Sequence, residues 1–532
     1  MSTVIGLADR PWHLSYQKFH ISNRITQPDG VETLVDYLDY LFAKQSRKTA
    51  FTCAGVSLTF DELAYHSRIL AAHLQQSGLR PGDKVAVMMP NILHYPIAMA
   101  AVIRAGLVLV NVNPLYTARE LLHQLNDAQA KALIVAGHFS GTVEEIIGQT
   151  AVEYVVKTAG TRDFCGRFGE LLPADGSRYI RPEISGTDVA LLQYTGGTTG
   201  VAKGAMLTHQ GLIANVYQLD AVIGGALGGS NGYILTALPL YHIFAFSVCV
   251  LFGMQAGLAN LLVPNPRDLA ALVQAVQTYR PVMIPAVNTL FNALLSDSGF
   301  CRMDHSHVKL CVGGGMAILN DTAERWAAVV GKPIIEGCGL SETGTVISVN
   351  PPAAGYTASI GIPLPLTDIR IADEGGAECP PGVSGEICVA GPQVMKAYWR
   401  REHERNEYMT PDGYFKTGDI GVMDEAGFIK IIDRKKDVVN VSGFNVYPSE
   451  IERVFSAHPG IRECCAVGVP DGRSGEAVKL FVVGVAGPPD SDGLKAWGRQ
   501  YLTAYKLPKY IEWIDEIPKS AVGKILRKNL KA

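Results

Sequence analysis

A glycine- and threonine-rich stretch with one lysine is the first part of this sequence that could do chemistry. It reads YTGGTTGVAKG over residues 194–204, after the apolar run 189–192 and before a helix-like segment at 212–216. Glycines let backbone N–H groups approach an anion, threonine hydroxyls add donors, and lysine adds positive charge. We expect strand, glycine loop and helix in that order around a polyphosphate. The alternative is a plain surface loop.

The stretch is not a Walker loop. Counted from Gly197, the second glycine position holds Ala202, and the residue after Lys203 is Gly204, which has no hydroxyl for a magnesium ion. Any phosphate site here must therefore be of another kind.

Three further segments carry candidate site residues. Ser341 and Glu342 follow a strand-like run, where the carboxylate suits Mg²⁺ and the hydroxyl suits a phosphate oxygen, unless Ser341 only caps a helix. His242 follows the apolar run 234–240, and a lone histidine in that position is more often a core residue than a catalyst. Gly313–Gly315 follow another strand and could lie against a flat ring or form a tight turn.

The composition limits the classes of protein to consider. A chain of 532 residues needs several domains, and a net charge of -3 without a basic stripe argues against nucleic-acid binding. Ten scattered cysteines without a CxxC pair indicate reduced thiols in a cytoplasmic protein, and no signal peptide is expected.

Residues 231–266 carry no charged side chain, and 243–263 could span a bilayer. We expect a buried helix followed by a core strand instead.

Alternating helix and strand patterns predict an α/β fold with a parallel sheet covered on both faces. The expected helices of this part are 31–44, 59–78 and 95–105, and the strands are 49–53, 84–89, 108–112, 132–135, 189–192, 234–240, 282–284 and 308–312. Thr59 and Glu62 form a capping box.

Short strands at 368–371, 385–389, 414–419 and 428–432 indicate a small β subdomain, and a charge run at 433–437 suggests a linker. The last hundred residues predict an α+β unit with helices 450–457 and 492–502 and strands 466–469 and 479–485.

Five motifs in this order resemble the adenylate-forming superfamily of acyl-CoA synthetases, nonribosomal adenylation domains and luciferases. They are YTGGTTGVAKGAMLTH at 194–209, GCGLSETG at 337–344, YFKTGDIG at 414–421, DRKKDVVNVSGFNVYPSEIE at 433–452 and PKSAVGKILRKNL at 518–530. NVNPLYTARELLHQL at 111–125, IIDRKKD and VSGFNVYP are most similar to bacterial long-chain fatty acid CoA ligases.

The resemblance implies an architecture and a set of site residues. It implies a large N-terminal domain of stacked α/β sheets with a small β subdomain over 1–432, a hinge at 433–436 and a mobile α+β C-terminal domain over 437–532. The implied nucleotide-binding residues are Thr195, Gly196, Gly197, Thr198, Thr199, Gly200 and Lys203 for the β- and γ-phosphates, Gly313, Gly314, Gly315, Gly337, Cys338 and Gly339 for adenine, Ser341 for the α-phosphate, and Asp419 with Arg434 for the ribose.

The remaining implied roles concern the metal, the acid and the movement of the small domain. Glu342 and Thr195 would serve Mg²⁺, and His242 would lie beside the acyl carboxylate. Lys436 matches the hinge, about which rotation would bring the loop with Gly443 to the thiol channel and withdraw the catalytic Lys524.

The resemblance implies ATP-dependent, two-step formation of acyl-CoA through an acyl-adenylate, with ATP, Mg²⁺ and coenzyme A as cofactor and co-substrates. The uncharged stretch 231–266 would then wall a dry tunnel for a fatty chain. Alternatives are another carboxylic acid, transfer to a carrier protein, or a membrane-embedded acyl transporter that binds nucleotide. A peripheral contact with the inner membrane face and a homodimer stay open.

Overall fold

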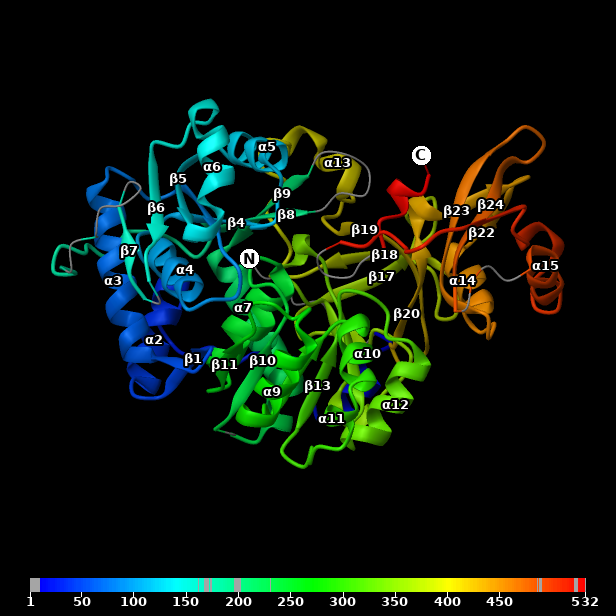
Figure 1. Cartoon of the computed structure of the whole chain (residues 1–532), viewed down its shortest axis with the longest axis horizontal. Helices are drawn as coiled ribbons and strands as arrows, with labels where there is room; N and C mark the ends of the chain where they lie inside the picture. The colour runs from blue at the N-terminus through cyan, green and yellow to red at the C-terminus, as the bar shows by residue number, and fades with distance from the viewer. Residues whose placement is uncertain are drawn as a thin grey trace. The chain divides into compact units, whose positions relative to one another are not determined.

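The computed structural model describes residues 10–160, 162–166, 172, 175–195, 202–229, 231–485, 487, 490–520 and 525–531. Within these ranges the chain forms two compact units (Figure 1). Unit 1 contains the described residues up to 368 together with 390–407, and unit 2 contains 369–389 and the described residues from 408 onward. The domain limits at 432 and 436 stay predictions.

Unit 1 is built on two large sheets. The seven-stranded sheet has the order β7-β6-β5-β3-β4-β8-β9, parallel in its interior and antiparallel in its outer pairs β6–β7 and β8–β9. Its strands are β3 (Lys84–Met88), β4 (Val108–Val112), β5 (Ala130–Val135), β6 (Tyr154–Thr158), β7 (Phe164–Cys165), β8 (Val189–Thr195) and β9 (Lys203–Thr208).

The nine-stranded sheet has the order β16-β15-β14-β13-β12-β10-β11-β1-β2 and is parallel from β14 to β1. Its strands are β1 (Thr49–Cys53), β2 (Val56–Thr59), β10 (Tyr233–Thr236), β11 (Ala259–Leu262), β12 (Met283–Ala286), β13 (Leu310–Gly313), β14 (Ile334–Cys338), β15 (Ser348–Val349) and β16 (Ile362–Pro363). The expected parallel α/β architecture is confirmed.

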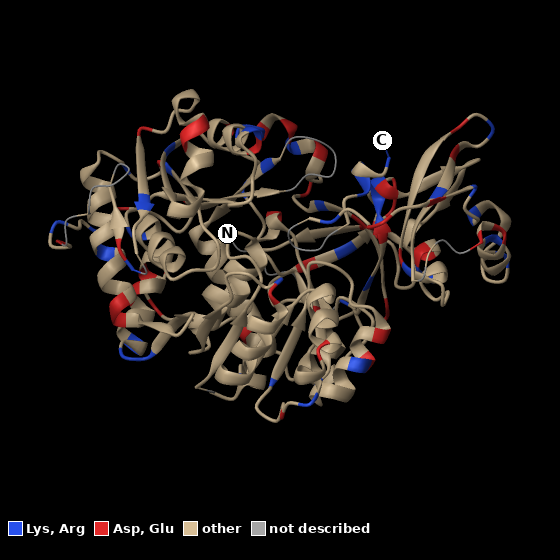
Figure 2. Ribbon diagram, viewed as in Figure 1, with Lys and Arg blue, Asp and Glu red and all other residues tan. Residues whose placement is uncertain are grey.

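Helices cover the two sheets of unit 1. They are α1 (His13–Lys18), α2 (Leu34–Gln45), α3 (Phe60–Gln76), α4 (His94–Arg104), α5 (Ala118–Ala128), α6 (Ser140–Ile146), α7 (His209–Ile223), α8 (Gly253–Gln255), α9 (Leu269–Tyr279), α10 (Asn288–Ser296), α11 (Ser298–Cys301), α12 (Asn320–Val330) and α13 (Arg405–Tyr408). The capping box at the start of α3 is confirmed, because Thr59 Oγ1 accepts from Glu62 N and Glu62 Oε2 accepts from Thr59 N. Figure 1 shows α10 and α12 beside β13, and Figure 2 shows few charged residues on the strands of both sheets.

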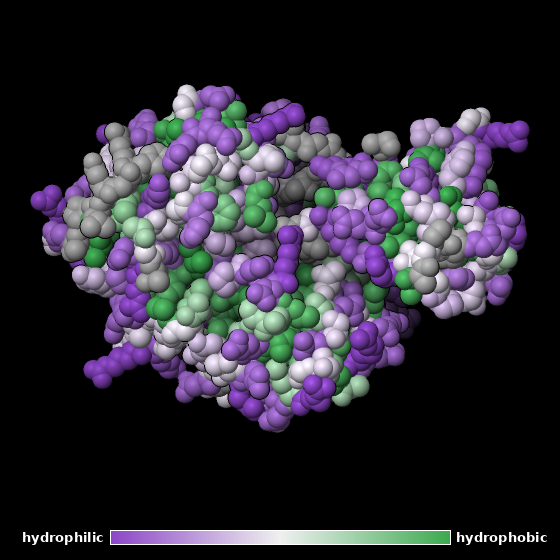
Figure 3. Space-filling view, in the orientation of Figure 1, coloured by the Kyte–Doolittle hydropathy of each residue, from purple (hydrophilic) through white to green (hydrophobic). Residues whose placement is uncertain are grey.

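The middle of the uncharged stretch 231–266 is buried, as expected, while Asn231, Pro264 and Asn265 near its ends are exposed. A fully buried π-helical segment, η5 (Ala245–Phe252), leads through α8 into the core strand β11. No helix among the described residues is long and apolar enough to cross a membrane. Figure 3 shows hydrophilic residues spread between hydrophobic ones over the face in view.

Unit 2 contains two sheets of its own. The first has the order β17 (Asp368–Ala372), β18 (Gly385–Ala390), β19 (Phe415–Met423), β20 (Ile429–Arg434), which confirms the small β subdomain. The second has the order β22 (Phe444–Val446), β21 (Val439–Val441), β24 (Gly475–Gly484), β23 (Ile461–Asp471), with β25 (Tyr510–Trp513) parallel to β24. Helices α14 (Pro448–Ser456) and α15 (Ser491–Arg499) accompany it, so the α+β character is also confirmed.

The expected order of strand, glycine loop and helix at residues 189–216 is wrong. A second strand, β9, follows the glycine stretch and pairs antiparallel with β8, and α7 begins only after it. β9 is held on its other side by backbone hydrogen bonds to residues 396–399. This pairing partner is almost two hundred residues away, so the local sequence could not reveal it.

The bounds of two expected strands, 234–240 and 308–312, also differ from those observed, since β10 ends at Thr236 and β13 begins at Leu310.

Candidate active site

The lysine of the glycine stretch belongs to a network of charged and aromatic side chains in unit 1. Lys203 begins β9 and pairs in register with Thr195, the last residue of β8. Its Nζ donates to Glu404 Oε2 at 2.6 Å and lies 5.3 Å from the centre of the Tyr398 ring. Arg401 Nη1 donates to the other oxygen of the same carboxylate at 2.8 Å. The candidates Gly196, Gly197, Thr198, Thr199 and Gly200 lie outside the described residues.

Glu342 is joined to the same side-chain network through Tyr398. The tyrosine hydroxyl donates to Glu342 Oε1 at 2.6 Å, and Tyr398 reaches it because it pairs with Ala205 in β9. Glu342 is buried in a short 3-10 turn, η6 (Ser341–Thr343). The structure thus brings together the cation and the carboxylate that the sequence proposed for phosphate and Mg²⁺.

Tyr398 and Glu404 are site residues that sequence reasoning missed. They lie 56 residues after Glu342 and 201 residues after Lys203, respectively, and no local pattern marks them. The helix-cap alternative for Ser341 is wrong, because Leu340 stands at the cap position and its N–H donates to Thr343 Oγ1.

The two glycine sets expected at adenine lie at the carboxyl ends of the neighbouring parallel strands β13 and β14. Gly313 is in register with Glu336, three residues before Gly339. A Cβ on Gly313 would lie 2.6 Å from Ile318, and one on Gly314 would lie 3.1 Å from the Phe244 ring. The carboxyl ends of parallel strands are the usual place for ligands in α/β sheets.

Gly339 is the tightest of these glycines. A Cβ there would lie 1.2 Å from the carbonyl oxygen of Thr345, so no other residue fits without moving the backbone. Thr345 itself has a φ of 143°, a strained value for a β-branched residue. Gly337 and Cys338 are the last residues of β14, and Gly315 has a positive φ of 78°.

A buried carboxyl that the sequence did not suggest lies beside these glycines. Glu336 Oε1 accepts the N–H of Ile318 at 2.9 Å and thereby fixes the turn that follows Gly315. Burial raises the pKa of the Glu336 carboxyl to about 7.

His242 lies at the start of the buried segment that contains η5. Its Nδ1 accepts the N–H of Phe244 at 3.3 Å, so the neutral ring carries its proton on Nε2. Thr345 Oγ1 donates to the carbonyl oxygen of Ile243 at 3.0 Å, and Ser247 Oγ donates to that of Gly344 at 2.6 Å. These bonds join the segment after His242 to the turn that carries Glu342.

A buried amide network fixes the loop that precedes His242. Asn91 Nδ2 donates to the carbonyl oxygens of Thr236 and Leu238, and Asn91 Oδ1 accepts the N–H of Leu240 at 2.9 Å. Tyr95 donates to the carbonyl oxygen of Leu240 at 2.9 Å. The loop is therefore held at three points by the side chain of Asn91, which lies between β3 and α4.

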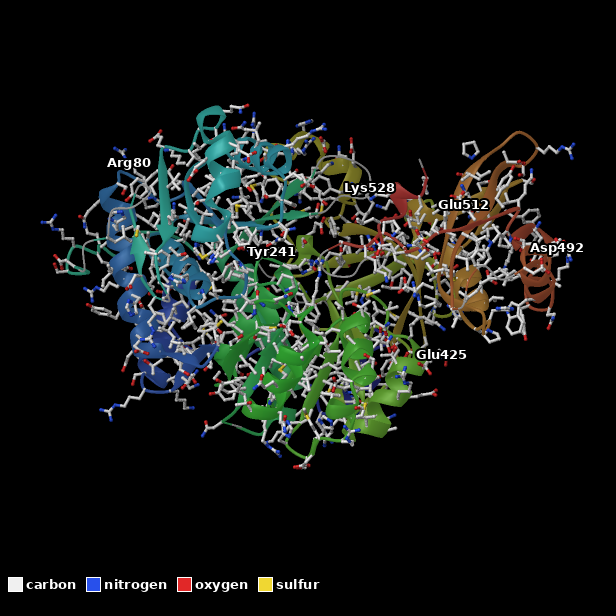
Figure 4. The ribbon with its side chains drawn as sticks, viewed as in Figure 1. Arg80, Tyr241, Glu425, Asp492, Glu512 and Lys528 are labelled. Atoms are coloured by element: carbon white, nitrogen blue, oxygen red, sulfur yellow. The ribbon has the colours of Figure 1, made fainter. Side chains whose placement is uncertain are left out.

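Gln193 extends this network from β8. Its Oε1 accepts from Asn111 Nδ2 at 3.1 Å, and its Nε2 donates to the carbonyl oxygen of Tyr241 at 3.2 Å. Tyr241, labelled in Figure 4, directly precedes His242. One side chain thus connects the strand of the glycine stretch with the backbone beside His242.

The remaining candidates lie in unit 2. Arg434 Nε and Asp419 Oδ1 form an ion pair of 2.6 Å on the neighbouring strands β20 and β19. Lys436 follows in the short turn η9 (Lys435–Asp437), and Gly443, with a φ of 88°, lies between β21 and β22. Lys524 lies outside the described residues. On either side of it, Lys519 and Ile525 pair as a β-bridge.

The C-terminal segment is anchored by a pair that the sequence also did not reveal. Arg527 Nη2 donates to both oxygens of Glu452 at 2.7 and 2.8 Å, and Glu452 Oε1 also accepts the N–H of Ala466. Figure 4 labels Lys528, the neighbour of Arg527, on this segment.

Comparison with known proteins identifies the family. The family model of AMP-binding enzymes matches residues 39–399, and that of the AMP-binding enzyme C-terminal domain matches residues 450–524. The chain belongs to the AMP-binding enzymes. This AMP-binding enzyme is 46% identical to a long-chain-fatty-acid–CoA ligase of Escherichia coli O6:H1 over 95% of each chain. It is 42% identical to one of Haemophilus influenzae over 98% of each chain.

Solved structures agree with the fold. ATP-bound MatB from Rhodopseudomonas palustris matches this AMP-binding enzyme with a TM-score of 0.83 and 29% identity, over 93% of this chain and 98% of that chain. The superfamily resemblance seen in the five motifs is therefore confirmed, while the roles of individual site residues stay predictions.

Proposed function

We propose that this AMP-binding enzyme is a long-chain-fatty-acid–CoA ligase that forms acyl-CoA from ATP, a fatty acid and coenzyme A. The observation that carries the proposal is the similarity of 42–46% over nearly the whole chain to bacterial enzymes of that name. The cluster of Lys203, Tyr398 and Glu342 supports it, because it offers a cation and a carboxylate to one polyphosphate.

The first half-reaction needs positioning and countercharge but no protein nucleophile. A carboxylate oxygen of the fatty acid bonds to the α-phosphorus of ATP, and the bond from that phosphorus to pyrophosphate breaks. Negative charge then accumulates on the phosphate oxygens. Lys203 supplies countercharge at the β- and γ-phosphates, and Ser341 donates to the α-phosphate. His242 orients the acid with its Nε2–H.

Glu342 fits a magnesium ion that arrives with the nucleotide. Mg²⁺ in nucleotide sites takes one or two carboxylates and completes its shell with phosphate oxygens and water. Among the described residues there is no group of three or more His, Cys, Asp or Glu that could hold a metal ion by itself. When bound, the ion neutralises charge on the phosphates; Thr195 lies at the end of β8 as its second candidate contact.

The second half-reaction transfers the acyl group from AMP to the thiolate of CoA. Asp419 and Arg434 hold the ribose hydroxyls, and Lys524 supplies the additional cation in the first half-reaction only. Rotation about Lys436 then presents the turn with Gly443 to the thiol. Lys524→Ala should lose acyl-adenylate formation and keep thioester formation from supplied acyl-adenylate; equal loss of both would contradict this assignment.

The segment behind His242 supports an apolar acid. All eight residues of η5, which begins three residues after His242, are buried, and none carries a charge. Such a segment can line a dry site for an alkyl chain.

Acid-dependent exchange of labelled pyrophosphate into ATP tests the proposal most directly. We expect exchange with long-chain fatty acids and thioester formation with free CoA. Failure to exchange with every acid of a panel from short to long chains would refute it. A preference for an aryl acid, or for carrier-protein phosphopantetheine over CoA, would favour the alternative ligases. Peripheral membrane contact and a homodimer remain predictions, to be tested by vesicle sedimentation and by light scattering.

A further inference from the structure

The carboxylate of Glu404 holds the ammonium group on which the proposed phosphate site depends. Lys203 Nζ and Glu404 Oε2 are 2.6 Å apart, and the two side chains are 34% and 16% exposed. We propose that Glu404 competes with the phosphates of ATP and with pyrophosphate for Lys203, so that it weakens nucleotide binding and promotes release of pyrophosphate. This inference rests on the proposed function.

Glu404 is held in place by two cations, so its contact with Lys203 is part of a small ion-pair network. Its other oxygen, Oε1, accepts from Arg401 Nη1 at 2.8 Å, three residues earlier in the chain. Hydrogen bonds from Lys203 and Arg401 lower the pKa of the Glu404 carboxyl to about 2. The group is therefore charged at every pH at which the enzyme would work.

A polyphosphate and this carboxylate cannot both hold the same ammonium group without repelling each other. An ammonium group has three donors on a flexible stem, so Lys203 can turn from one acceptor to another. Two anions that share one cation lie within a few ångströms of each other, and their repulsion in a partly buried site is a substantial cost. ATP must displace Glu404 in order to use Lys203, and Glu404 takes the lysine back when pyrophosphate leaves.

Tyr398 limits how far Lys203 has to move. The ammonium group lies 5.3 Å from the centre of the ring, and the hydroxyl of the same ring donates to Glu342. The lysine is thus kept near the carboxylate proposed for Mg²⁺ whichever anion it binds. A change of partner needs rotation of the end of one side chain and no rearrangement of β9.

A simple positioning role for Glu404 predicts the opposite result. If Glu404 only held Lys203 in a productive place, its removal would weaken ATP binding and raise the KM for ATP. If it competes, its removal strengthens the binding of both ATP and pyrophosphate. The sign of the change decides between the two roles.

The test is Glu404→Gln in the full-length enzyme, with Glu402→Gln as its matched control. Glu402 is exposed and lies with Glu404 in the short 3-10 turn η8 (Glu402–Glu404), and no ion pair joins it to the described part of the chain. Its substitution by glutamine removes the same charge. Because ion pairs of this exposure contribute up to about 1 kcal/mol, we expect a roughly two- to fivefold fall in the KM for ATP in Glu404→Gln. The inhibition constant for pyrophosphate should fall by a similar factor, and Glu402→Gln should change neither.

Two further measurements keep the test decisive. Glu404→Asp retains the charge on a shorter side chain, so we expect a smaller shift in the same direction, and this variant replaces Glu404→Gln if the latter does not fold. A higher or unchanged KM for ATP in both Glu404 variants would overturn the competition while wild-type pyrophosphate exchange still upheld the ligase. Absence of exchange in the wild type would refute the proposed function itself.

Discussion

Replacing Gln193 with leucine should loosen the loop that carries His242. Gln193 accepts from Asn111 and donates to the carbonyl oxygen of Tyr241, and its side chain connects β8 with that loop. Leucine has a similar size and no hydrogen-bonding group. The substitution therefore leaves one buried amide N–H and one carbonyl oxygen without their partner.

The size of the effect follows from these two groups. Each buried polar group left unsatisfied costs about 1–3 kcal/mol, so two of them give about 2–6 kcal/mol. Gln193 and Asn111 are only 4% and 3% exposed, whereas Tyr241 is half-buried and water can reach its carbonyl more easily. We expect a loss of about 2–4 kcal/mol in the local stability of this part of unit 1.

Native-state hydrogen exchange is the suitable assay, because global unfolding of a chain with two units need not be two-state. Peptides that cover residues 232–246 should exchange faster in Gln193→Leu, and the KM for the fatty acid should rise more than that for ATP. The control is Gln277→Leu, since Gln277 is exposed on α9. The reasoning would be refuted if the free energy of local opening obtained from exchange in Gln193→Leu stayed within about 0.5 kcal/mol of the wild-type value.

Three other predictions follow from contacts in the two units. Gly339→Ala should abolish adenylate formation or folding, because its Cβ would lie 1.2 Å from a backbone oxygen, whereas Gly141→Ala, with open space around it, should express and exchange pyrophosphate normally. Arg527→Met should cost unit 2 about 2–4 kcal/mol in urea unfolding, because it leaves the partly buried Glu452 carboxylate without its cation, and the added change Glu452→Leu should restore most of the loss. Burial lowers the pKa of His209 from 6.5 to about 4, so its contribution to stability is full above pH 6.5 and is lost, by up to about 3 kcal/mol, as the pH falls to 4. His209→Gln should flatten that pH dependence in thermal unfolding, and an unchanged slope would contradict the assignment.

Much of the fold could be predicted because its signals are local. The capping box of Thr59 and Glu62 spans four residues, and both hydrogen bonds are present. The alternation of helices and apolar strands was sufficient to predict the parallel sheets. The uncharged run 231–266 was sufficient to predict a buried helix and a core strand. β9 was missed because its place depends on pairing with β8 and with residues 396–399.

Residue types and their order along the chain are enough to show which chemical groups this protein offers a ligand. The glycine stretch with Lys203, the turn with Ser341 and Glu342, and the C-terminal motif with Lys524 are each readable within a dozen residues. Their types already favour a polyphosphate, because backbone N–H groups, a cation and a carboxylate are what such a ligand requires.

How these groups are connected could be seen only in the folded protein. The fold placed Tyr398 between Lys203 and Glu342 and gave Lys203 the partner Glu404. It also connected Gln193 to the backbone beside His242. The physical reason is that such contacts join residues that are tens to hundreds of positions apart, and the path of the chain through two sheets, not any neighbouring residue, fixes which of them meet.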